Sequence, residues 1–121
     1  MNRTVEVEIS ALADLAVDCW RLQRWAFVDG YERDRIVPRQ VFRALSSFLS
    51  RAGLEICDLT GQAYDPGLAV EVIDSEVDST APKASARIEE MIAPIVLWNG
   101  SLIKTGQVAI RRGAPDQEVA S

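Results

Sequence analysis

The sequence contains no histidine, and this absence restricts its chemistry more than any other feature of its composition. Histidine is the commonest general base near neutral pH and the commonest protein ligand of transition metals. A Ser/His/Asp triad and a Cys/His pair are therefore excluded. The sequence also lacks a Gly-x-Gly-x-x-Gly fingerprint and a P-loop, the motifs that hold the phosphates of nucleotides. We expect a protein that is not an enzyme and binds no cofactor or metal.

Cysteine and long apolar runs are also scarce. Cys19 and Cys57 are the two cysteines, and they form no Cys-x-x-Cys pair, which is typical of reduced thiols in a cytosolic protein. The first residues carry alternating charge in place of the apolar core of a signal peptide. No apolar run approaches the roughly 20 residues of a membrane-spanning helix. We expect a soluble, cytoplasmic protein with no membrane partner.

Positive charge is outweighed, since 13 lysines and arginines stand against 18 acidic residues and give a net charge of −5. Binding to nucleic acid needs a cationic surface that displaces counterions, and binding to anionic lipid needs the same charge. Neither partner is expected. Apolar residues, by contrast, make up 48% of the chain, which is typical of a globular domain.

The first half of the chain has the pattern of two amphipathic helices. Ser10 is a suitable N-cap, and apolar residues recur at helical spacing over residues 11–28. Pro38 can begin a second helix, and Gly53 can end it in a left-handed conformation. The apolar stripe of the first helix is Leu12, Leu15, Ala16, Cys19, Leu22 and Ala26. That of the second is Val41, Leu45, Phe48, Leu49 and Ala52.

From Leu54 the apolar period changes from 3.6 to 2, which predicts strands. Asn99-Gly100 is a strong hairpin signal, because both central positions of a type I′ turn need positive φ. Pro94 has no amide to donate and should lie at a sheet edge. The expected strands are residues 54–58, 68–73, 88–98 and 101–111. We therefore expect an α+β fold with a helical segment at 1–53, a small antiparallel β-domain at 54–112 and a flexible tail at 113–121.

An acidic segment, residues 74–83, is expected to be a mobile loop. Its alternating Asp74, Glu76 and Asp78 could gather a hard cation, but the spacing lacks the glycine and the bidentate glutamate of an EF-hand loop. A solvated acidic loop is the favoured interpretation.

Tryptophans outside the expected core are the best candidates for contact with a partner. At 100° per residue, Trp25 lies near Asp14, Asp18 and Arg21 on the polar face of the first helix. It is either part of an interface, where tryptophan is enriched, or it stacks on Arg21. Trp98 adjoins the Asn99-Gly100 turn and either fills a cross-strand pair or contacts a partner. The first helix is apolar over much of its circumference, so a dimer interface could bury the apolar surface that its own chain leaves exposed.

The run from about Phe42 to Ile110 resembles the C-terminal part of the GrpE family. The shared features are an amphipathic helix that ends at Gly53, the strand start Leu54-Glu55, the dipeptide Asp65-Pro66 before a second strand, and a long final hairpin. The chain departs from the family in lacking its long N-terminal helix, and it has Ala69 where the family usually has histidine.

The resemblance implies a non-catalytic nucleotide exchange factor. GrpE-like proteins form homodimers through a bundle of two helices per chain, and their β-domain opens the ATPase lobe of a DnaK-type chaperone. The partner is then a DnaK-type ATPase or a divergent relative. The implied dimer interface is Leu15, Cys19, Trp20, Leu22, Trp25 and Phe48. The implied partner-binding residues are Leu97, Trp98, Leu102, Ile103 and Lys104.

Two other functions remain open. The first is a non-catalytic adaptor or structural subunit of a larger bacterial assembly that retains the fold. The second is a small ligand-binding or regulatory domain, for which the sequence offers no converging polar groups.

Overall fold

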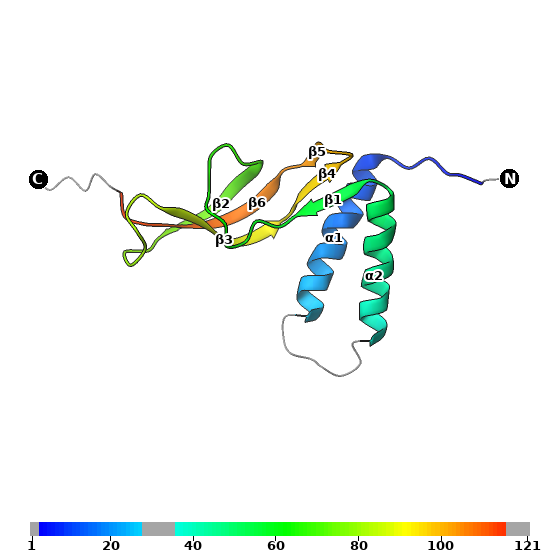
Figure 1. The fold of residues 1–121 in the computed structure, drawn as a ribbon, viewed down its shortest axis with the longest axis horizontal. Coiled ribbons are helices and arrows are strands. Elements are labelled where there is room, and N and C mark those ends of the chain that lie inside the picture. The colour runs from blue at the N-terminus through cyan, green and yellow to red at the C-terminus, as the bar shows by residue number, and fades with distance from the viewer. Residues whose placement is uncertain (1–2, 28–35, 116–121) are drawn as a thin grey trace, which may run out of the picture. The chain divides into compact units, whose positions relative to one another are not determined.

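The structure is a computed structural model of the 121-residue chain, and it describes residues 3–27 and 36–115. Two helices come first and strands follow, which confirms the α+β class and the predicted order (Figure 1). The helices are α1 (Ile9–Phe27) and α2 (Ile36–Arg51). The connecting loop expected around residues 30–35 and most of the expected tail, 116–121, lie outside the described residues.

The strands form two small sheets in place of one antiparallel domain. The first sheet has the order β1-β4-β5 and the second β2-β6-β3. The strands are β1 (Leu54–Cys57), β2 (Val70–Val77), β3 (Ala86–Ala93), β4 (Ile95–Trp98), β5 (Ser101–Lys104) and β6 (Gly106–Arg112). Because β2 runs parallel to β6, the second sheet is mixed, and the prediction of an antiparallel β-domain is wrong on this point. Local turn signals specify only pairings between neighbouring strands, and β2 and β6 are far apart in the sequence.

The predicted long hairpin is present but interrupted. Its first arm is divided by Pro94 into β3 and β4, and its second arm by Thr105 into β5 and β6. Pro94 is fully buried and cannot donate a ladder hydrogen bond, so pairing stops there. The turn itself is as predicted, with φ of 48° at Asn99 and 84° at Gly100.

The chain folds into two compact units. The first contains residues 1–56 and 96–104, and the second contains residues 57–95 and 105–121. The segment 96–104, which the sequence pattern grouped with a separate β-domain, therefore belongs with the helices. The first unit holds both helices and most of the β1-β4-β5 sheet, and the second unit holds the β2-β6-β3 sheet.

The core of the first unit joins the helices to their sheet. It is formed by Ala13, Ala16, Val17, Leu49, Leu54 and Val96. Small side chains on α1 face this core, while Leu15 and Leu22, which were expected on the main apolar stripe, are exposed. The buried face of α1 is therefore centred on small residues, with Ile9, Leu12 and Cys19 packed beside them.

The core of the second unit is built from cross-strand pairs between β3 and β6. Ile88 lies opposite Ile110, and Met91 lies opposite Val108, and all four side chains are buried. Residues 74–77, expected in a mobile loop, continue strand β2. The prediction for this segment is wrong because pairing with β6 extends the strand beyond its local alternating pattern.

No helix within residues 3–27 and 36–115 combines the length and the apolar character that crossing a membrane requires.

Candidate protein-binding surfaces

Gly53 follows the end of α2, and the hairpin turn at Asn99-Gly100 packs against its backbone. Its φ is +91°, the left-handed conformation predicted from the sequence. The amide of Asn99 donates to the carbonyl oxygen of Gly53 at 2.9 Å. A Cβ at position 53 would overlap the Asn99 side chain, so the approach depends on the absence of a side chain there.

Trp98 holds the hairpin to the end of the same helix and remains partly open to solvent. Its Nε1–H donates to the carbonyl oxygen of Ala52 at 3.0 Å, while 38% of the residue is exposed. Trp98 therefore has a structural role, and its exposed part is still available to a partner. The hairpin turn is not wholly covered by its own unit.

The other predicted partner-binding residues divide into two groups. Leu102 is 49% exposed, and Leu97 is half-buried. Ile103 packs against the core of the first unit, and Lys104 forms an ion pair with Asp14 of α1. Trp98 and Leu102 are therefore the members of the set best placed to contact another protein.

The two helices expose several large apolar side chains. At 100° per residue, Leu15 and Leu22 lie on the side of α1 opposite the buried Ala13. Trp25 is 78% exposed, and Phe48 of α2 is 46% exposed. We define the helical apolar patch residues as Leu15, Leu22, Trp25, Val41 and Phe48. A helix that buries one face and leaves apolar residues on the opposite one is typical of a helix with a further packing partner.

The remaining residues of the expected dimer interface are half-buried within α1. The guanidinium of Arg24 lies 4.6 Å from the centroid of the Trp20 ring. The cation–π contact on this helix thus uses Arg24 and Trp20, where the sequence suggested Arg21 and Trp25. Cys19 packs beside the core, and burial, with a smaller effect of Asp18, raises the pKa of its thiol. A raised pKa makes Cys19 a poor nucleophile.

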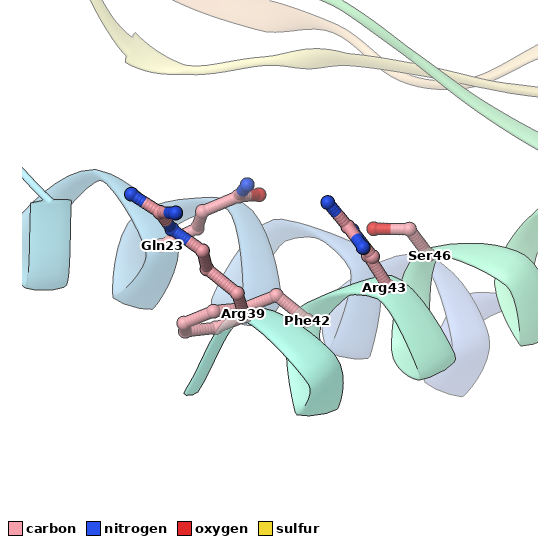
Figure 2. A pocket seen from close by; sticks show the side chains of 5 residues that line it. All are labelled: Gln23, Arg39, Phe42, Arg43 and Ser46. Carbon is pink, nitrogen blue, oxygen red and sulfur yellow. The ribbon is translucent and has the colours of Figure 1, made fainter. Parts of the chain in front are cut away.

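A shallow groove between α1 and α2 was not predicted. It has a volume of about 240 Å³ and is lined by Gln23, Arg39, Phe42, Arg43 and Ser46 (Figure 2). The structure records no carboxylate partner for Arg39 or Arg43 among residues 3–27 and 36–115. Both arginines lie outside the apolar stripe expected for α2, and Gln23 comes from the other helix, so the groove could not be predicted from either helix alone.

In the second unit, Arg111 gathers three carboxylates. Its guanidinium lies 2.6 Å from Glu89 and 3.7 Å from both Glu76 and Asp78. The pKa of Asp78 is lowered, first by its hydrogen bonds from the side chain and backbone of Thr80 and then by Arg111. Two of the three alternating acids considered for cation binding, Glu76 and Asp78, thus lie beside an arginine. Within residues 3–27 and 36–115, no three His, Cys, Asp or Glu residues cluster to hold a metal ion.

The exposed residues on these surfaces are mainly aromatic, aliphatic and arginine side chains. The aromatic and arginine side chains among them are of the kinds that are enriched in protein–protein interfaces. The two cysteines are not joined in a disulfide, and both are half-buried thiols.

No protein-family model matches the chain, and a search of curated proteins finds no match to it.

Proposed function

We propose that this chain is a cytoplasmic, non-catalytic docking protein that acts as a GrpE-like nucleotide exchange factor on a DnaK-type ATPase or a divergent relative. The observation that carries the proposal is the attachment of an exposed hairpin turn to the end of a helix. Gly53 and Ala52 hold Asn99 and Trp98 by two hydrogen bonds, and Leu102 is left exposed beside them. A rigid turn with exposed apolar residues loses little entropy when a partner binds it.

The proposal includes a homodimer formed through the helices. The helical apolar patch residues supply the surface, with Leu15 and Leu22 two turns apart on one side of α1. A second copy would bury these side chains at about 25 cal/mol per Å² of apolar surface. Two helices from each copy would then form a four-helix bundle, the arrangement implied by the resemblance to GrpE.

The test is the release of a fluorescent ADP analogue from a candidate DnaK-type ATPase, followed by stopped flow. We expect the chain to accelerate release, and we expect Leu102→Ser to reduce the acceleration because Leu102 is exposed and has no role in the core. Val7→Ser is the matched control, since it removes a similarly exposed apolar side chain that lies outside both the hairpin and the helical apolar patch. Acceleration that is unchanged in Leu102→Ser would remove the hairpin from the docking surface.

The second candidate is a non-catalytic adaptor or structural subunit of a larger bacterial assembly. It is favoured by the Arg39/Arg43 groove, which offers a cationic surface in an otherwise acidic chain. Capture of a DnaK-type ATPase without faster nucleotide release would support the adaptor and reject the exchange factor.

A further inference from the structure

The sheet β2-β6-β3 has two edges that differ in how they are protected. Along β3, Gly61 donates to the carbonyl oxygen of Ile88 at 2.8 Å, Ile88 donates to that of Gln62 at 2.9 Å, and Tyr64 donates to that of Ala86 at 2.9 Å. Residues 61–64 therefore cover the first part of this edge, at residues 86–88. Along the outer side of β2, no strand pairs within residues 3–27 and 36–115 (Figure 1). An uncovered edge presents backbone groups that can pair with another chain.

Strand β2 is unusually open for its length. It has eight residues, of which Val70 is half-buried and the other seven are exposed. Three of the exposed residues are large and apolar: Val72, Ile73 and Val77. Native proteins rarely leave such an edge without a means of limiting its pairing.

The register with β6 assigns the side chains of β2 to two different faces. Val72 lies opposite the buried Val108, and Ser75 opposite the buried Ile110, so these residues share the apolar face of the sheet. A register shift between Val72 and Asp74 leaves Ile73 without a residue opposite it on β6, so the side chains change their alternation between the two faces of the sheet at this point. The residues on the other face are Glu71, Asp74 and Glu76, which lie opposite Gln107, Ala109 and Arg111.

We propose that the outer edge of β2 accepts an extended segment of a partner protein in which apolar residues alternate with lysine or arginine. Backbone hydrogen bonds to β2 would supply affinity, and the alternating side chains would supply specificity. Apolar residues of the segment cover Val72 and Val77, which are 36% and 57% exposed. Basic residues lie beside Glu71 and Asp74 on the opposite face, where opposite charges across strands stabilise pairing.

Charge disfavours two segments of this chain that could otherwise pair with the edge of β2, namely a second β2 and the N-terminal segment. A second β2 would place like charges from Glu71, Asp74 and Glu76 close to one another, which destabilises strand pairing. The N-terminal segment 4–9 alternates in the required way, but its polar positions are Glu6 and Glu8. The occupant is therefore a basic segment of a different protein. The inference is independent of the proposed exchange activity, because β2 and the hairpin turn belong to different units.

The first experiment measures binding of a labelled nine-residue peptide by fluorescence anisotropy. Every second residue of the peptide is lysine, and the residues between the lysines are valine or threonine. A matched peptide has glutamate in place of lysine. We expect the lysine peptide to bind at least about tenfold more tightly, because like charges across strands are unfavourable. Glu71→Gln/Asp74→Asn should weaken its binding by about fivefold through the lost charge complementarity. Glu6→Gln/Asp18→Asn, which changes the net charge equally but lies in the first unit, should leave binding unchanged.

The second experiment follows hydrogen exchange with and without the lysine peptide. We expect slower exchange for amides of β2 and no change for those of residues 86–88 in β3, whose outer edge is already covered. Equal binding of both peptides, equal weakening by the two double variants, or unchanged exchange in β2 would overturn the proposal. Slower β2 exchange at higher protein concentration without peptide would identify a second copy as the occupant and would also overturn it.

Discussion

Trp98 donates its indole N–H to the carbonyl oxygen of Ala52, a residue 46 positions earlier, across 3.0 Å. The last carbonyls of a helix have no partner within the helix. The Trp98 side chain of the hairpin therefore caps the C-terminal end of α2. Gly53, the residue after Ala52, turns the backbone away from the helix axis. Helix end and hairpin turn form one connected element in the first unit.

Removing this hydrogen bond should weaken the first unit. We expect Trp98→Phe to lower the free energy of unfolding by about 1 kcal/mol, the usual net value of a hydrogen bond in a protein. Trp25→Phe is the control, because Trp25 is 78% exposed in the monomer, and at protein concentrations where the chain is monomeric it should change stability by less than about 0.5 kcal/mol. Urea denaturation measures both. Equal losses in the two variants would mean that the bond to Ala52 contributes nothing.

Two glycines with positive φ should respond differently to the same substitution. Gly53→Ala and Gly100→Ala both place a side chain in the left-handed region, which costs about 1–2 kcal/mol. Nothing lies within 4 Å of a Cβ at position 100, whereas at position 53 it would overlap Asn99. We therefore expect Gly53→Ala to cost up to about 1 kcal/mol more than Gly100→Ala, because the Asn99 side chain must leave its preferred rotamer.

A second substitution, at residue 99, separates the effect of side-chain overlap from that of backbone strain at residue 53. In an Asn99→Gly background the overlap is gone, so the additional cost of Gly53→Ala should largely disappear when unfolding is measured by denaturant. A cost that is independent of residue 99 would locate the whole effect in the backbone conformation.

The proposed homodimer predicts which leucine substitutions affect assembly and which affect folding. Leu22 is 50% exposed, so Leu22→Lys should prevent dimer formation. It should change the free energy of unfolding of the monomer by less than about 0.5 kcal/mol. Leu49 belongs to the core, and Leu49→Ala should cost about 2–5 kcal/mol. Size-exclusion chromatography with light scattering reports the assembly. A wild-type monomer at micromolar concentration would contradict the dimer.

The loop after β2 should depend on the charge of Asp78. Its carboxylate accepts hydrogen bonds from the amide and hydroxyl of Thr80 at 2.9 and 2.6 Å, and its pKa is lowered. The folded state therefore favours the charged form. The stabilisation is complete above the ordinary aspartate pKa of about 3.9 and is lost as pH falls through the lowered pKa.

Exchange of the Thr80 amide, measured by NMR across acidic pH, follows this loss. Asp78→Asn keeps an acceptor oxygen but loses the charge, so its Thr80 amide should be less protected and its protection should not change with pH, after correction for the intrinsic rate. Protection of Thr80 that is the same in wild type and Asp78→Asn would show that the carboxylate charge is not the cause.

Local features of the sequence were sufficient to predict most of the elements. The apolar period of 3.6 before Gly53 and of 2 after it predicted the two helices and the change to strands, and Asn99-Gly100 predicted the turn. The failures concern pairing over long distances. Parallel pairing between β2 and β6 extended β2 to Val77, and buried Pro94 divided an apparently continuous strand.

The candidate surfaces were predicted in part. Trp98 and Leu102, which the resemblance to GrpE assigned to the partner-binding surface, are exposed, whereas Lys104 is paired with Asp14 of the first helix. The Arg39/Arg43 groove was missed because it combines side chains from both helices. Charge and apolar character can be assigned to single positions, but a pair across elements is defined only when the elements pack.

The sequence by itself determined the absence of histidine chemistry, the order of helices and strands, and the two glycine-dependent turns, because each depends on residue type and nearest neighbours. Tertiary structure alone decided which face of α1 is buried, which strands pair in parallel and which sheet edge stays open. These outcomes depend on how side chains from distant parts of the chain fill a common core, and no local pattern specifies that packing.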